Sequence, residues 1–125
     1  MGLAVENLVA NHARDLLPLL NLRGALVLSA APYRRRGGDG PRSRRGCQID
    51  LLVQTRSTVC VVEVKRKAEI GREVIGETDA KVKALSLPSG VSARAALVYE
   101  GHLSPVVEAD GYFDVLVPFH RLLGL

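Results

Sequence analysis

The chain has 125 residues, the size of a single domain, and 47% of them are hydrophobic, which is enough for a substantial core. This composition excludes bulk disorder. No apolar run approaches the ~18 residues that cross a bilayer, and no signal-peptide pattern opens the chain, so we expect a cytoplasmic protein with no membrane partner. The net charge of +4 is local, because residues 34–45 alone carry six Arg and one Asp.

The hydrophobic pattern predicts one α/β domain over residues 1–125, with a central mixed sheet flanked by helices. The expected order is α-β-β-β-α-β, followed by a fifth strand and a short helix. The ranges are 2–21 for the first helix, 25–33, 47–54 and 59–66 for three strands, 70–86 for the second helix, and 93–100 and 112–117 for two further strands. Pro18 should disturb the end of the first helix, and Pro118 suits the start of a short terminal helix.

Two adjoining strand segments each carry one carboxylate. If residues 55–58 form a hairpin loop, Gln54 pairs with Val59, and Asp50 then lies opposite Glu63. Directly opposed side chains have Cβ atoms ~4.5–5.5 Å apart. Two carboxylates at that distance repel unless a positive charge lies between them. A divalent cation such as Mg²⁺, which binds carboxylates, water and substrate phosphate, meets this need.

The same register puts the only two cysteines, Cys47 and Cys60, on one face of the hairpin but several rungs apart. That separation exceeds the ~7 Å Cα–Cα limit for a disulfide. With no further Cys and three scattered His, the sequence does not favour a zinc site. Two free, buried thiols suit a reducing compartment.

The segment Glu63-Val64-Lys65 places two opposite charges at the end of an apolar strand. Because a strand alternates faces, Glu63 and Lys65 point to one face and Val64 points to the other. An exposed Glu–Lys pair at a strand end is the structural alternative. The expected position of Asp50 opposite Glu63, on an otherwise buried strand, favours a functional site.

Two further charged residues lie on the hydrophobic faces of the predicted helices. Glu6 lies on this face of the first helix, where an unpaired carboxylate costs several kcal/mol to bury. It either meets a cation or donor, or it lies in a frayed first turn helped by the helix dipole. Lys81 lies on the inward face of the second helix. It either pairs with Glu77 one turn earlier or holds phosphate or the active-site carboxylates.

The order of the charged residues along the chain resembles the PD-(D/E)XK nuclease superfamily over residues 2–100. These residues are Glu6, Asp50, Glu63-Val64-Lys65, Glu77 and Lys81. The segments RRGCQIDLLVQT, VVEVKRK and IGREVIGETDAKVKAL are similar to nuclease-like domains at the C-terminus of certain bacterial and archaeal AAA-type ATPases, although this chain has no Walker A pattern. The chain departs from the family at Ile49, where the family has Pro. Glu77 and Lys81 stand where some members carry Gln and Tyr. The resemblance implies a restriction-endonuclease-like core.

The resemblance also implies a metal-dependent endonuclease that hydrolyses phosphodiester bonds in DNA. We expect a preference for branched or flapped DNA, because nothing in the sequence resembles a base-reading helix. Asp50, Glu63 and the carbonyl of Val64 would ligate Mg²⁺ or Mn²⁺, with Glu6 as an additional ligand. Lys65 would orient or help deprotonate the attacking water and stabilise charge on the phosphate. Lys81 is a further candidate catalytic residue. Oxygen ligands favour a hard cation, which would polarise the phosphodiester.

The arginine-rich loop is expected to bind nucleic-acid phosphates, since guanidinium groups bind phosphate through two hydrogen bonds without reading sequence. Its members are Arg34, Arg35, Arg36, Arg42, Arg44 and Arg45. A soluble loop with incidental charge is the alternative. The expected partner is DNA, with RNA left open. Two other functions stay open: a non-catalytic nucleic-acid-binding or regulatory module working with an ATPase partner, and a structural fragment whose strand edges form a homodimer.

Overall fold

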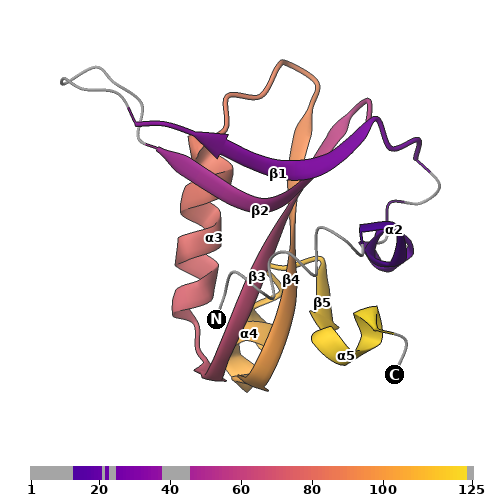
Figure 1. Cartoon of the computed structure of the whole chain (residues 1–125). Coiled ribbons are helices and arrows are strands. Elements are labelled where there is room, and N and C mark those ends of the chain that lie inside the picture. Colours follow the sequence, from indigo (N-terminus) through magenta and orange to yellow (C-terminus); the bar gives the residue numbers. More distant parts are fainter. Residues whose placement is uncertain (1–12, 21, 23–24, 38–45, 124–125) are drawn as a thin grey trace.

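A five-stranded mixed sheet with helices on both faces forms the centre of this α/β chain (Figure 1). The computed structural model describes residues 13–20, 22, 25–37 and 46–123. The elements are α2 (Ala13–Leu16), η1 (Leu17–Leu20), β1 (Ser29–Arg35), β2 (Cys47–Gln54), β3 (Thr58–Ile70), α3 (Glu73–Ala84), β4 (Ser92–Leu103), α4 (Pro105–Asp110), β5 (Val115–Pro118) and α5 (Phe119–Leu122). None of the helices in these ranges has the length and apolar character needed to cross a bilayer.

The strands lie in chain order across the sheet, from β1 to β5. β1, β2 and β3 form an antiparallel meander, whereas β3, β4 and β5 run parallel. Parallel neighbours need a crossover connection, and α3 and α4 lie in the two connections. The prediction of a helix starting at residue 70 is wrong at its first turn, because Ile70 pairs with Leu103 as the end of β3.

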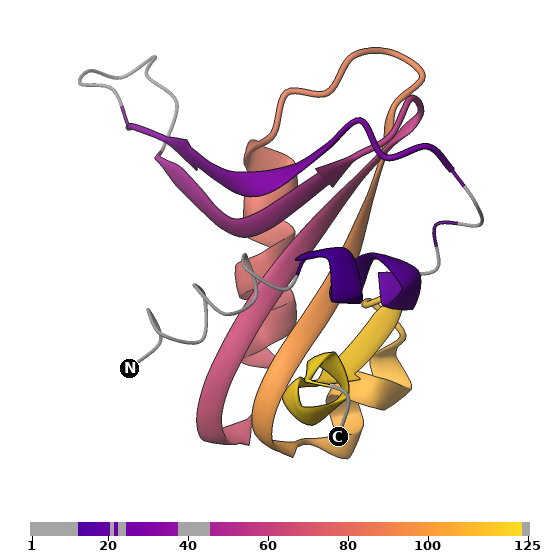
Figure 2. The same ribbon diagram turned by 45° about the vertical axis from the view of Figure 1, so that its right-hand side comes forward.

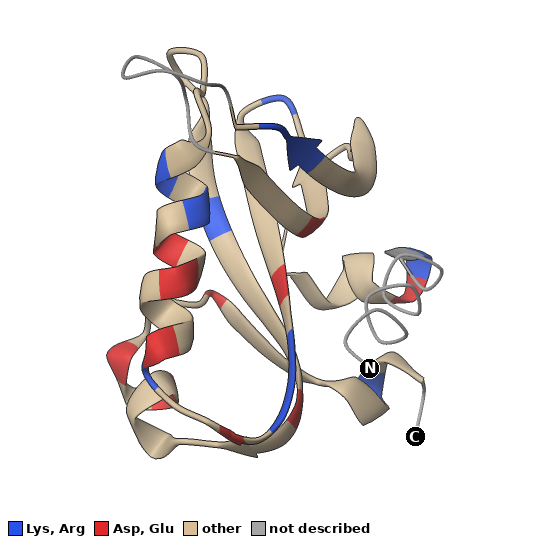
Figure 3. Cartoon of the chain, turned by 60° about the vertical axis from the view of Figure 1, so that its left-hand side comes forward, with Lys and Arg blue, Asp and Glu red and all other residues tan. Residues whose placement is uncertain are grey.

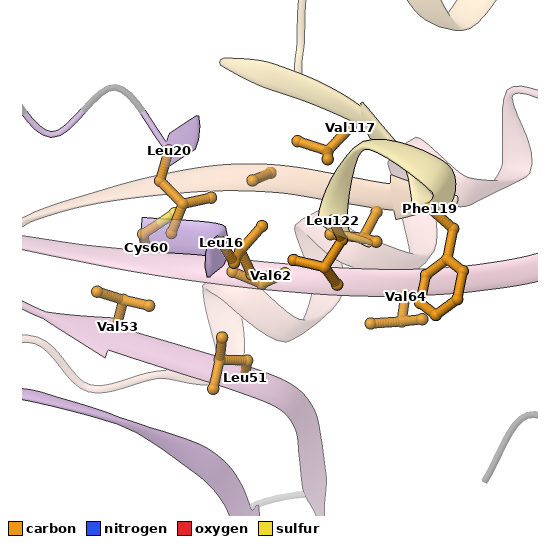
Figure 4. Close-up of a cluster of buried hydrophobic side chains, with 12 residues drawn as sticks. Leu16, Leu20, Leu51, Val53, Cys60, Val62, Val64, Val117, Phe119 and Leu122 are labelled. Carbon is orange, nitrogen blue, oxygen red and sulfur yellow. The ribbon is translucent and has the colours of Figure 1, made fainter. Parts of the chain in front are cut away.

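Side chains of β3 divide the core between the two faces of the sheet. Cys60, Val62 and Val64 pack with residues of α2, η1 and α5 on one face, as Figure 4 shows. Val59 and Val61 lie on the other face with partly buried residues of α3. Figure 2 shows α2 and α5 on the near side of the sheet and α3 behind it. Burial of each Val or Leu contributes about 1.5–3 kcal/mol, so β3 is the strand on which both layers depend.

The predicted first helix is described only from residue 13 onward, so Glu6 lies outside the described residues. The described part changes from α-helix to 3-10 helix at Leu17, next to Pro18. The ring of Pro18 removes a backbone donor at that point, as expected from the sequence. Leu16 and Leu20 on the same segment are buried against the sheet.

A β-bulge in β2 changes which residues share a face. Ala31 of β1 pairs with Leu52, but Tyr33 pairs with Ile49, so two residues of β2 oppose Pro32. Pro32 has no N–H to donate and suits such an irregular edge position. The extra residue reverses the side-chain alternation along the first half of β2.

The bulge makes the prediction of a shared cysteine face wrong. Cys47 belongs to the cluster under α3, whereas Cys60 belongs to the cluster under α2 and α5. The two free thiols are therefore separated by the sheet itself. Burial raises the pKa of the Cys60 thiol to about 11, which makes it unreactive.

A second bulge brings β3 and β4 into close approach at a glycine. The register shifts between Arg66 and Glu69, so Lys67 and Ala68 oppose Gly101. Gly101 has φ of +129°, a conformation that side chains rarely adopt, and a Cβ there would lie 1.8 Å from the carbonyl oxygen of Lys67.

Gly101→Ala should therefore lower the free energy of unfolding by about 3 kcal/mol or more, through both backbone strain and the clash. Gly90→Ala is the matched control. Gly90 also has positive φ, but no atom lies within 4 Å of the position that a Cβ would take there, so its loss should be about 1–2 kcal/mol. Urea unfolding of both variants measures the difference, and equal losses would contradict the close approach of the strands.

Candidate active site

The carboxylates of Asp50 and Glu63 lie next to each other on the sheet face that α3 covers. The predicted pairing of Gln54 with Val59 is confirmed, and the ladder continues to Leu51 with Val62. Asp50 and Glu63 lie just beyond the last paired residues, and their carboxyl groups interact through a side-chain hydrogen bond. Glu63 is only 4% exposed, whereas Asp50 is partly buried, so one carboxylate of the pair is enclosed and the other is partly accessible.

Asp50 is fixed by the main chain of the neighbouring strand. The N–H of Val64 donates a hydrogen bond of 2.9 Å to Oδ2 of Asp50. The N–H and C=O of one strand residue point to the same side, so the carbonyl of Val64 is also directed toward Asp50. The Val64 side chain packs on the opposite face of the sheet, which confirms the predicted alternation along Glu63-Val64-Lys65.

Two of the ion pairs between β3 and α3 lie beside these carboxylates. Lys81 Nζ lies 3.1 Å from Oε1 and 2.9 Å from Oε2 of Glu63. Lys65 Nζ lies 2.6 Å from Oε2 of Glu77. The alternative of a Glu77–Lys81 pair within the helix is therefore wrong.

The spacing of the two elements explains why the pairs cross from strand to helix. Four helical residues advance about 6 Å, and two strand residues advance about 6.6 Å. Two pairs can therefore form side by side when strand and helix run in opposite directions. All four charged residues can be identified in the sequence. Their ion-pair partners could not be predicted, because they depend on how α3 packs over β3.

Burial dominates the electrostatics of Glu63. Desolvation, followed by the hydrogen bond with Asp50, raises the pKa of Glu63 from 4.5 to about 7, while Lys81 acts in the opposite direction. The hydrogen bond to Glu77 raises the pKa of Lys65, with a smaller opposing effect of burial. Lys65 is therefore positively charged at neutral pH, and its charge lies near Glu63, whose ionised form is disfavoured by burial.

The oxygen donors present fit a hard divalent cation. Oε2 of Glu63 is enclosed and, among the described residues, accepts no hydrogen bond of good geometry, although Lys81 Nζ is close to it. Asp50, Glu63 and the carbonyl of Val64 supply oxygen from two adjoining strands, which is the donor chemistry of Mg²⁺ and Mn²⁺. The described residues contain no group of three or more His, Cys, Asp or Glu side chains that could hold a metal. The fourth expected ligand, Glu6, is outside the described ranges.

Three of the six predicted phosphate-binding arginines are described. Arg34, Arg35 and Arg36 border a hollow of about 380 Å³ together with Gly46 and neighbouring residues at the start of β2. Arg34 and Arg36 are exposed. Arg42, Arg44 and Arg45 lie outside the described residues.

Arg35 also has a structural contact that the sequence did not suggest. Its Nη1 donates a 2.8 Å hydrogen bond to the carbonyl of Ala84, the last residue of α3. A cation is favourable at the C-terminus of a helix, where carbonyl groups lack intrahelical donors. The sequence signal was weak because the two residues are 49 positions apart.

No family model matches the sequence, and no curated protein and no solved structure matches it either.

Replacing Glu63 by Gln should change how stability depends on pH. A carboxyl whose pKa is higher in the folded protein destabilises the fold as it ionises, so this contribution is absent below pH 4.5 and complete above about pH 7. The stability of Glu63→Gln relative to the parent should therefore rise by about 3 kcal/mol over that window. Urea unfolding in EDTA measures it, and a difference that does not vary with pH would contradict the burial of an ionisable Glu63.

Proposed function

We propose that this chain is a metal-dependent DNA endonuclease with a restriction-endonuclease-like fold of the PD-(D/E)XK type. The observation that carries the proposal is the group of a buried Glu63 and the partly buried Asp50 and Lys65 on two adjoining strands of an otherwise aliphatic sheet. Burying a carboxylate beside a second carboxylate is costly, and such a cost is typical of functional sites. The sequence resemblance supplies the same three residues in the same order.

The order of elements supports the finer assignment of the fold. An antiparallel β1-β2-β3 meander leads through α3 to β4, which is parallel to β3. This is the β-β-β-α-β part of the expected core.

Each residue of the group has a defined role in the proposed reaction. Asp50, Glu63 and the carbonyl of Val64 would hold Mg²⁺ or Mn²⁺. When bound, the metal polarises the phosphodiester and lowers the pKa of a bound water. Asp50 is oriented for this role by the hydrogen bond from the N–H of Val64.

Lys65 acts as a positive charge and not as the base. Its pKa is raised by Glu77, so it is protonated at neutral pH and has no free electron pair to accept a proton. Its side chain is 27% exposed, which leaves the ammonium group accessible to a phosphate. It therefore stabilises the negative charge that develops on the phosphate in the transition state, while Glu77 orients it.

The charge distribution favours nucleic acid as the substrate. Figure 3 shows positive residues at the end of β1 and in the C-terminal half of α3, with acidic residues toward the other end of that helix. Contacts from Arg35 to Ala84 and from Cys47 to the carbonyl of Lys81 place the two basic segments next to each other. A phosphate backbone bound there lies beside the helix that carries Lys81. Contacts of this kind position a strand without reading its sequence.

Purified protein should cleave supercoiled, single-stranded or branched DNA in the presence of Mg²⁺ or Mn²⁺. Lys65→Met and Glu63→Ala should each reduce the cleavage rate at least about a hundredfold, as expected for the loss of a group that stabilises the transition state. Lys67→Met is the matched control, because Lys67 lies on the same strand but pairs with Glu73 at the surface. Cleavage that survives Lys65→Met would contradict the catalytic assignment.

Metal-independent DNA binding without cleavage of any of these substrates would favour the alternative function. The chain would then be a nucleic-acid-binding or regulatory module that works with an ATPase partner.

Replacing Arg34 and Arg36 together by Gln should weaken DNA binding and flatten its dependence on salt. Each lost phosphate contact should reduce the slope of log affinity against log salt by about 0.9. Arg121→Gln is the control, because Arg121 is exposed on α5, which covers the opposite face of the sheet. Fluorescence anisotropy between low and moderate salt measures the slopes, and an unchanged slope in the double variant would remove these arginines from the binding surface.

A further inference from the structure

The ammonium group of Lys81 lies against both carboxylate oxygens of Glu63, one of the proposed metal ligands. Nζ lies 3.1 Å from Oε1 and 2.9 Å from Oε2 of the same carboxylate. We propose that Lys81 is a built-in competitor of the divalent cation: it neutralises Glu63 in the metal-free protein and is displaced when the metal binds. This inference depends on the proposed metal-dependent function.

The geometry makes simultaneous occupancy unfavourable. Glu63 is only 4% exposed, and its two oxygens share one lysine. A bound Mg²⁺ takes carboxylate oxygens at about 2.0–2.1 Å. An ammonium group within hydrogen-bonding distance of both oxygens would then face a divalent cation across a single carboxylate, in surroundings that screen charge poorly. One of the two cations has to leave.

Lys81 is the group that can move. Its side chain is 30% exposed and carries the ammonium on a flexible four-carbon stem. Its main chain is held in place, because the carbonyl of Lys81 accepts a contact of 3.9 Å from Sγ of Cys47. Displacement therefore requires new side-chain rotamers and no movement of α3.

Lys65 does not share this position. Its partner Glu77 projects from α3 and is 45% exposed. That carboxylate is neutralised by Lys65 and is accessible to water. The metal therefore competes with one lysine and leaves the other in place.

After release, Lys81 adds a positive charge beside the basic segments at the end of β1, so metal binding also prepares the surface for phosphate.

The test is Mg²⁺ binding to the whole chain without DNA, measured by calorimetry at about pH 8.5, where protons compete little for Glu63. Lys81→Met keeps the apolar stem and removes the competing charge, so it should bind Mg²⁺ at least tenfold more tightly than the parent. Its midpoint of thermal unfolding in EDTA should be lower than the parent's, and Mg²⁺ should raise it by more. Lys83→Met is the control, because Lys83 pairs with Asp79 on the same helix and should leave the Mg²⁺ affinity unchanged.

Equal or weaker Mg²⁺ binding by Lys81→Met would overturn the inference, since it would show that Lys81 does not oppose the metal. Lys81→Gln provides a second test if the Met variant does not fold, because it removes the charge but keeps a hydrogen-bond donor for Glu63; it should also bind Mg²⁺ more tightly. Metal-dependent DNA cleavage by the parent with unchanged affinity in both variants would reject only this inference. No Mg²⁺ binding by any of the proteins would reject the proposed metal site as well.

Discussion

Everything in the site depends on the burial of one carboxylate, Glu63, at the point where the sheet changes from aliphatic to charged. Ionised carboxylates are almost never buried alone. Three features of the structure reduce the cost of burying this one. Asp50 forms a side-chain hydrogen bond with it, Lys81 reaches it from the helix, and its own pKa rises to about 7. The fold thereby holds an unfavourable charge in a defined place, which is the condition that a cation-binding centre requires.

The parts of this arrangement that depend on neighbouring residues in the chain could be predicted from the sequence. The four-residue loop fixed the pairing of Gln54 with Val59, and strand alternation fixed the opposite directions of Glu63 and Val64. The parts that depend on distant residues could not. The partner of Lys81 depends on the position of α3, and the face of Cys47 depends on a bulge opposite Pro32 in another strand. Pairing with β4 likewise extended β3 to Ile70, beyond its apolar pattern.

The two faces of the sheet have different tasks. The face under α2 and α5 is lined by hydrophobic side chains (Figure 4), and the other face combines a core with the charged group. Because β3 supplies residues to both, its hydrophobic side chains anchor the strand while its charged side chains remain available for chemistry. A strand held so firmly on one face keeps the carboxylates positioned on the other, which is the preorganisation that catalysis by electrostatic stabilisation needs.

The hydrogen bond from Arg35 to the last carbonyl of α3 joins the edge of the sheet to the end of the helix. Arg35 stands between Arg34 and Arg36, so movement of this edge strand is coupled to the final turn of α3 through a hydrogen bond of 2.8 Å. Lys81 belongs to that turn. The edge strand β1 and the C-terminal end of α3 are thus mechanically coupled, and a displacement of β1 is transmitted to the helix turn beside the carboxylates.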